Sequence, residues 1–502
     1  MNGRYPELLE RLGEISDLGR SRALLAWDER TMMPAGGADS RAEQVATLTG
    51  IRHRLLSSDE LGALLDELRP RAEELPYDSD EASMVRIATR EWRKARRVPT
   101  ELRAEIARAA SLGERAWLDA KRDSDFERFL PHLERNVELK RRYVGCFDDA
   151  DHPYDPLLDD FEPEATTAEV RAVLAELREG LRPLVAAIAE RADAVDSSCL
   201  HGEFPLEAQR RLVTELVAEL PLGAEVWRLD TTVHPFATAI ATTDIRLTTR
   251  YDESYIGAAL WSAIHEAGHG LYESGIDPAL RRTPLCRPPS LGFHESQSRT
   301  WENWVGRGRP YLGWIHPRLR DAFPGPLGDV DPEALYRAAN RVVPSLIRME
   351  ADELTYNLHI ALRFELELDI FEDRLALAEL PEAWNARTKE YLGIDVPDDA
   401  NGLLQDVHWA AGSFGYFPTY SLGNVLAGQI WARATEVLPE LDEQIARGEL
   451  RPLGEWLREH VYRHGGKLNP AEMIERVCGE SISVGPYLAQ MRAKFGEIYG
   501  IT

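Results

Sequence analysis

The stretch Tyr255–Gly275, YIGAALWSAIHEAGHGLYESG, carries the motif HEAGH near its middle. Apolar residues recur along it at helical spacing and Ser254 can cap its start, so we predict one amphipathic helix. On a helix, His265 and His269 share a face at about 5 to 6 Å, which suits two imidazoles that bind one tetrahedral zinc ion. Glu266 lies about 100° round the helix, where its carboxylate can reach a water without occupying the ion. This layout predicts metal-assisted hydrolysis.

Two glycines inside this helix support a special role for it. Gly268 and Gly270 each cost about 1 kcal/mol relative to alanine in a helix interior. We interpret them as positions where something approaches the helix backbone closely. The alternative is a chance HExxH motif in an ordinary helix, because 13 histidines in 502 residues produce one in roughly a few per cent of chains.

Composition excludes several classes of function. The chain has 59 Lys and Arg against 85 Asp and Glu, a formal net charge of −26, which argues against nucleic-acid phosphate as a partner. No run approaches 18 apolar residues and Met1–Arg20 has no apolar leader core, so we expect a soluble cytoplasmic protein without a membrane partner. The four cysteines are far apart and show no CxxC spacing, which predicts neither a disulfide framework nor a thiolate metal cluster.

The pattern along the chain predicts a mainly α fold. We expect one helical metallopeptidase domain over residues 1–502, made of the following parts: an N-terminal helical half (1–200), a small antiparallel β-sheet (225–251), the metal and substrate site (254–424) and C-terminal helices (425–502). A small sheet directly before a zinc-type helix is a natural place to hold an extended peptide substrate. His234 precedes Pro235 in this region, and it is either a turn histidine or a residue that reaches the site.

A third metal ligand is expected from a second helix. Glu295 lies 26 residues after His269, and three protein ligands plus water is the pattern of catalytic zinc. His294 is the competing ligand and Glu302 a further alternative. We prefer Glu295, with His294 hydrogen-bonded behind the ligands.

One arginine in the C-terminal half of the chain needs a negatively charged partner. The segment Arg341–Glu367 reads as Pro344 followed by a long amphipathic helix, on which Arg348 and Asp352 are four residues apart. An arginine on a core-facing helix needs a negative partner. This partner is either Asp352, in an internal ion pair, or the carboxylate of a substrate.

An aromatic, glycine-rich segment interrupts the helices at Gly402–Asn424. Such breaks are costly to order and often line sites. His408 or Tyr420 could donate a hydrogen bond to the oxyanion of a tetrahedral intermediate. Packing of these rings in the core is the alternative interpretation.

Six motifs occur together in one order: HPF (234–236), DIRLT (244–248), HEAGH (265–269), HESQ (294–297), IRMEAD (347–352) and GLLQDVHW (402–409). In order and spacing they resemble the carboxypeptidase Taq family of metallocarboxypeptidases, also called thermostable carboxypeptidase 1. The resemblance implies a cytoplasmic, largely helical homodimer that has a deep substrate groove with a metal ion at its floor. It also implies broad removal of C-terminal amino acids from peptides, with little action after proline.

The resemblance also implies roles for individual residues. His265, His269 and Glu295 would bind one divalent ion, with Zn²⁺ favoured over Co²⁺ or Mn²⁺, and Glu266 would act as general base. His408 and Tyr420 resemble the His and Tyr pair that helical gluzincins place beside the scissile carbonyl. Arg348 would bind the terminal carboxylate of the substrate, with Arg246 as the alternative.

Two other functions stay open at this point. An endo-acting oligopeptidase of the same helical type would also cleave peptides that are blocked at the C-terminus. A non-catalytic peptide-binding scaffold with a vestigial site is the second alternative, and the intact set of His265, Glu266, His269 and Glu295 argues against it.

Overall fold

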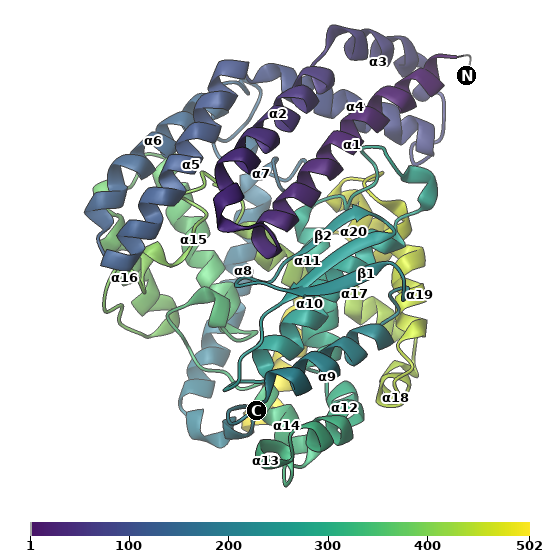
Figure 1. The fold of residues 1–502 in the computed structure, drawn as a ribbon. Helices are drawn as coiled ribbons and strands as arrows, with labels where there is room; N and C mark the ends of the chain where they lie inside the picture. The colour runs from purple at the N-terminus through teal and green to yellow at the C-terminus, as the bar shows by residue number, and fades with distance from the viewer. Residues whose placement is uncertain (1–2, 502) are drawn as a thin grey trace. The chain divides into compact units, whose positions relative to one another are not determined.

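The computed structural model describes residues 3–501 as a mainly helical protein with one small sheet (Figure 1). Within these residues there are 21 α-helices and three β-strands. The predicted fold class is therefore confirmed. None of the described helices has the length and apolar character that a membrane span requires.

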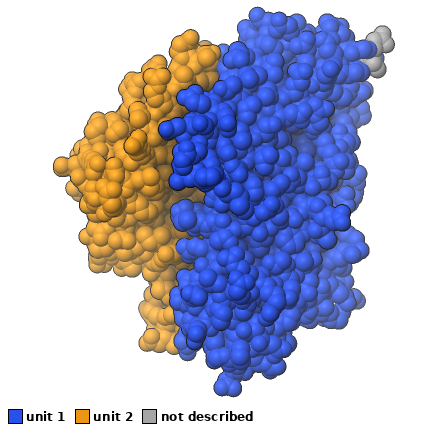
Figure 2. All heavy atoms as spheres, in the orientation of Figure 1, with its two compact units in different colours: residues 1–96, 196–339, 430–481 blue, residues 97–195, 340–429, 482–502 orange. Residues whose placement is uncertain are grey.

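The chain forms two compact units, each assembled from three separate sections (Figure 2). Unit 1 comprises residues 1–96, 196–339 and 430–481, and unit 2 comprises residues 97–195, 340–429 and 482–502. Distant sections are joined by hydrogen bonds within each unit. The Tyr77 hydroxyl donates to Glu472 in unit 1, at 2.6 Å, and the Val342 amide donates to the Tyr499 hydroxyl in unit 2, at 2.8 Å. The single domain expected over 1–502 stays a prediction.

Nearly every helix lies within a single unit, either unit 1 or unit 2. Those wholly or almost wholly in unit 1 are α1 (Arg4–Thr31), α2 (Ala38–Leu56), α3 (Asp59–Ala72), α4 (Asp80–Arg97), α9 (Leu206–Glu219), α10 (Gly257–Gly275), α11 (Leu291–Arg299), α12 (Arg309–Ala322), α13 (Pro324–Leu327), α14 (Pro332–Ala339), α18 (Leu441–Ala446), α19 (Arg451–His460) and α20 (Pro470–Cys478). Those in unit 2 are α5 (Thr100–Asp123), α6 (Phe126–Val144), α7 (Asp155–Leu158), α8 (Thr167–Ala189), α15 (Thr355–Phe371), α16 (Leu380–Leu392) and α21 (Gly485–Tyr499). Helix α17 (Pro418–Val437) begins in unit 2 and ends in unit 1.

The sheet has three strands in the order β1-β3-β2, namely β1 (Trp227–Thr231), β3 (Asp244–Thr249) and β2 (Ala237–Ala241). Strands β2 and β3 form an antiparallel hairpin, but β1 runs parallel to β3. The expectation of an antiparallel sheet is therefore wrong for the β1–β3 pair. Alternation of apolar and polar residues identifies strands, but it does not say which strands are neighbours. Here β3 enters between β1 and β2, which are consecutive in the chain.

Helix α10 packs on this sheet. A Cβ on Gly270 would lie 2.9 Å from Ile245 Cγ2 of β3, and the hydroxyls of Thr249 and Ser262 are 2.7 Å apart. The predicted helix is present, but Ser254 does not cap it. The cap position is Ile256, and the Ser254 hydroxyl instead donates to Asp252 at 2.6 Å.

The helix predicted after Pro344 begins later than expected. Helix α15 starts at Thr355, and Asp352 accepts the amides of Leu354 and Thr355 at 3.0 Å each. A carboxylate that accepts the first amides of a helix marks the helix start, because those amides have no partner inside the helix. Arg348 therefore precedes α15, and the alternative of an ion pair with Asp352 on a shared helix is wrong.

Candidate metal centre

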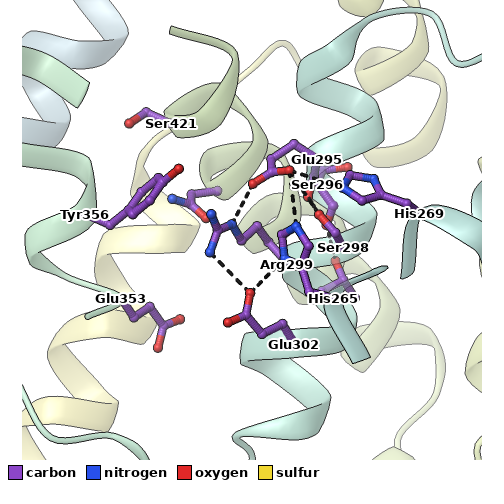
Figure 3. A network of polar contacts seen from close by, with 12 residues as sticks. His265, His269, Glu295, Ser296, Ser298, Arg299, Glu302, Glu353, Tyr356 and Ser421 are labelled. Atoms are coloured by element: carbon purple, nitrogen blue, oxygen red, sulfur yellow. Dashed lines mark hydrogen bonds and ion pairs between the residues drawn. The ribbon is translucent and has the colours of Figure 1, made fainter. Parts of the chain in front are cut away.

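Two helices of unit 1 bring together three side chains that could hold a metal ion (Figure 3). Helix α10 presents His265 and His269, and α11 presents Glu295. The Nε2 atoms of the two histidines lie 3.7 and 3.5 Å from Glu295 Oε2. One ligand atom from each residue lies within 4.8 Å of the others.

This geometry and donor set fit a divalent metal ion. Ligand atoms bound tetrahedrally at about 2.0 to 2.1 Å are about 3.3 Å apart, close to the two distances found here. Two imidazole nitrogens and one carboxylate oxygen leave the fourth position of a tetrahedral ion open, as in catalytic zinc sites. Burial lowers the pKa of His269, which favours the neutral ring that binds metal.

Gly268 explains how the second helix comes so close. A Cβ at this position would lie 2.6 Å from Ser298 Cα and 2.7 Å from the Gln297 carbonyl oxygen, both in the backbone of α11. Only glycine permits this approach without a shift of one helix. The prediction of a close approach at the two helix glycines is confirmed, at Gly268 by α11 and at Gly270 by β3.

A further carboxylate supports the first histidine. Glu302 Oε2 lies 2.9 Å from His265 Nδ1, which leaves His265 Nε2 directed to the candidate site. A carboxylate on the far nitrogen fixes both the tautomer and the orientation of a metal-binding imidazole. The structure thus places Glu302, considered above as an alternative ligand, behind His265. Glu302 lies in a π-helix (Thr300–Gly306) that continues α11, a rare element that often occurs at functional sites.

Arg299 is a residue that the sequence reasoning missed. Its Nε donates to Glu295 Oε1 at 2.8 Å and its Nη1 to Glu302 Oε2 at 3.2 Å (Figure 3). Burial by itself would raise the pKa of Glu295, but Arg299 and the two imidazoles hold that pKa well below its usual range. Its spacing, four residues after Glu295 and three before Glu302, is the signal that could have revealed it.

Burial shifts the pKa values of Glu266 and His294 in opposite directions. Glu266 is 5% exposed, and its burial raises its pKa to about 7. A carboxyl group with a pKa near neutrality can both take up and return a proton. The His294 ring lies against His269, with ring centroids 4.2 Å apart, and its Nε2 is 3.8 Å from Glu273 Oε1. Burial lowers the pKa of His294 to about 3.

A second group of expected site residues lies in unit 2, built around Asp406. Arg348 Nη2 is 2.7 Å from Asp406 Oδ1, and Arg363 Nη2 is 2.6 Å from Asp406 Oδ2. Arg348 also donates to the Tyr356 hydroxyl at 2.8 Å. We call Arg348, Arg363 and Asp406 the arginine cluster. All three side chains are buried, and two positive charges surround one negative charge.

His408 and Tyr420 lie beside this cluster in the same unit. His408 Nε2 is 3.2 Å from the Tyr420 hydroxyl, and the Arg348 guanidinium carbon is 4.9 Å from the Tyr420 ring centroid. Burial lowers the pKa of His408 to about 4, so the ring is neutral near neutral pH. The structure therefore brings Arg348, His408 and Tyr420 together.

The other two candidate residues lie in the sheet region of unit 1. His234 is exposed in the bend between β1 and β2. The Arg246 guanidinium on β3 makes an ion pair with Asp244 at 2.5 Å and covers the Trp27 ring at 4.8 Å. Arg246 is thus engaged by neighbouring side chains of the same unit.

Comparisons with known proteins agree with this geometry. A family model described as carboxypeptidase Taq (M32) metallopeptidase matches residues 7–495. The chain is 41% identical to thermostable carboxypeptidase 1 of Thermus thermophilus, with 99% of each chain covered, and 39% identical to carboxypeptidase 1 of Bacillus subtilis, with 98% of each covered. Its structure is similar to that of an M32 carboxypeptidase from Deinococcus radiodurans R1, with a TM-score of 0.96, 40% identity and coverage of 99% and 100% of the two chains.

Proposed function

The chain belongs to the carboxypeptidase Taq (M32) family and is a metallocarboxypeptidase, and from this premise we propose that it removes amino acids from the free C-termini of peptides with broad specificity. His265, His269 and Glu295 would hold one divalent ion, with Zn²⁺ favoured and Co²⁺ or Mn²⁺ as alternatives. The observation that carries this proposal is the convergence of their three ligand atoms within 4.8 Å, beside the buried carboxylate of Glu266.

The reaction uses Glu266 as general base. A divalent ion in this site supplies Lewis-acid polarisation of the scissile carbonyl and makes water easier to deprotonate. Glu266 takes a proton from the attacking water and passes it to the leaving amine. Its pKa of about 7 supports both transfers. Glu302 keeps His265 Nε2 available, and Arg299 keeps Glu295 ionised.

Three residues of unit 2 receive further roles. His408 and Tyr420 donate hydrogen bonds to the oxyanion, and the neutral state of His408 supports donation from one ring nitrogen. Arg348 binds the terminal carboxylate of the substrate. The excess positive charge of the arginine cluster supports this role, because an overall charge of −26 otherwise repels a carboxylate. Arg246 is the alternative carboxylate ligand, and His234 is a further proposed substrate contact.

The substrates are peptides with a free C-terminus. The cytoplasmic location and the homodimer implied by the resemblance stay predictions.

Product masses from a defined peptide mixture test this function. Each peptide is supplied with a free and with an amidated C-terminus, with and without a chelator. We expect stepwise loss of single C-terminal residues from the free peptides, at least tenfold slower loss from the amides, and no products with chelator until Zn²⁺ is returned. Internal cleavage of the amides would instead show an endopeptidase, and metal-loaded protein without products would show a binding scaffold.

A further inference from the structure

Glu367 on α15 is a fully buried carboxylate that has no role in the chemistry proposed above. Three donors of unit 2 point at it. The Trp409 indole Nε1 donates to Oε1 at 2.7 Å, the Gly415 amide donates to Oε2 at 2.8 Å, and the Tyr154 hydroxyl also donates to Oε2. Burial raises the pKa of Glu367 to about 7, and the three donors act against that rise because each favours the ionised carboxylate. Three hydrogen bonds to one buried side chain make Glu367 an anchor for the segments that donate them.

Two of these donors close one loop. Trp409 follows His408 directly, and Gly415 lies six residues further on, so the loop that begins after His408 returns to the same carboxylate. Gly415 has a φ of +89°, and a Cβ there would lie 2.4 Å from the Leu157 carbonyl oxygen. The close packing of Gly415 fixes the position of its backbone, and therefore the point at which the loop donates to Glu367.

The main chain after His408 is also held from α6. Asn136 Nδ2 donates to the carbonyl oxygens of Trp409 and Ala410, at 3.0 and 2.8 Å. Trp409 is therefore fixed through its backbone by Asn136 and through its side chain by Glu367. His408, whose ring Nε2 lies 3.2 Å from the Tyr420 hydroxyl, is the residue directly before this fixed tryptophan.

We propose that Glu367 is a positioning residue for His408: by accepting hydrogen bonds from Trp409 and Gly415, it holds the loop so that the His408 ring faces Tyr420. The proposal rests on the oxyanion role proposed for His408. Glu367 contacts no reacting atom and acts only through the loop. A purely structural anchor would also stabilise the loop. An experiment therefore has to distinguish positioning of His408 from stabilisation of the loop alone.

A double-mutant cycle makes this separation. Glu367→Gln, His408→Ala and the double variant are compared in the full-length, metal-loaded protein by kcat and KM on one free peptide. Glutamine keeps the size of the side chain but replaces one acceptor oxygen with a donor. We expect Glu367→Gln to lower kcat about 10-fold, with KM within about twofold, the loss that one misplaced hydrogen bond causes. In the His408→Ala background the same substitution should change kcat by less than about twofold.

The outcomes of the double-mutant cycle separate the role of Glu367 from the role of His408. Equal kcat losses in both backgrounds would overturn the positioning role of Glu367 and leave the role of His408 intact. A His408→Ala variant with a normal kcat would overturn the oxyanion role, and with it the premise for Glu367.

Two milder variants keep the test decisive if Glu367→Gln folds poorly. Trp409→Phe removes the indole N–H next to His408 together with one ring of a buried side chain, whereas Tyr154→Phe removes a hydroxyl donor that lies outside the loop. We expect Trp409→Phe to lower kcat severalfold with the same dependence on His408. Tyr154→Phe should lower the melting temperature and keep kcat within about twofold. Equal kcat losses in these two variants would overturn the proposal.

Discussion

The metal centre of unit 1 and the arginine cluster of unit 2 are built in different ways. In the metal centre, two of the three donors come from one helix, so the helical period alone places His265 and His269 on one face. In the arginine cluster, Arg348 lies in a short turn before α15 and pairs with Asp406, 58 residues away in another loop. Sites that one helix encodes can be predicted from residue spacing, whereas sites assembled from loops depend on tertiary packing.

The two regions also differ in charge. The metal centre places the carboxylates of Glu266, Glu295 and Glu302 around two histidines, an arrangement that favours a cation. The arginine cluster holds two guanidinium groups around one carboxylate, which favours an anion. A metallocarboxypeptidase that acts as proposed would use both, the first region for a metal ion and the second for the free carboxylate of its substrate.

Glu266→Ala should give the largest effect and tests the metal centre. We expect turnover to fall about 10²- to 10⁴-fold, the usual contribution of a general base, because no other group takes its proton-transfer role in the proposed mechanism. The bound metal should remain, since Glu266 is not one of the three donors. Steady-state kinetics and metal content per chain measure both quantities. Normal turnover would refute the base, and loss of the ion would show that Glu266 helps to bind it.

The same contrast explains what the sequence could predict. The mainly α fold, the strands before the helix and the expected grouping of Glu295 with the two histidines follow from periodicity and motif spacing. The order of the strands could not be predicted, because alternation carries no information on neighbours. The predicted start of α15 was wrong because Asp352 accepts the first amides of a helix that periodicity extends back to Pro344. Arg299 was missed because a charged residue on a helix is usually solvated.

Arg348→Ala should give the next largest effect and tests the arginine cluster. We expect kcat/KM on free peptides to fall about 10- to 100-fold, the value of a hydrogen-bonded charge, with a much smaller loss on the residual cleavage of amidated peptides. Folding should survive, because Arg363 still pairs with Asp406. Arg246→Ala is the comparison variant, because Arg246 is the alternative ligand, and it should have a smaller effect: Arg246 and Asp244 pair one to one, whereas two arginines share Asp406 in the arginine cluster. Equal losses on free and amidated peptides would exclude carboxylate recognition by Arg348.

Glu302→Gln should give a moderate effect on metal binding. We expect the affinity for Zn²⁺ to fall about 10-fold, at the lower end of the usual cost of losing such a supporting carboxylate, because the amide keeps one acceptor for His265. Competition with a chromogenic chelator measures this affinity. Glu273→Gln is a suitable control, because Glu273 faces His294 at 3.8 Å and His294 is not one of the three grouped ligands. An unchanged affinity in the Glu302 variant would mean that the helix alone orients His265.

Gly268→Ala tests whether the metal centre needs more than the period of one helix. Alanine gains about 1 kcal/mol of helix propensity, but its Cβ would lie 2.6 Å from the α11 backbone at Ser298. We expect the clash to outweigh this gain and to lower the free energy of unfolding by about 1 to 3 kcal/mol in denaturant titrations. Gly270→Ala should cost less, because its Cβ would meet the movable side chains of Ile245 and Leu247. Gly268→Ala should also weaken Zn²⁺ binding, because a displaced α11 would move Glu295. A variant as stable as the wild type, with normal metal affinity, would show that the close approach of α11 is not required for metal binding.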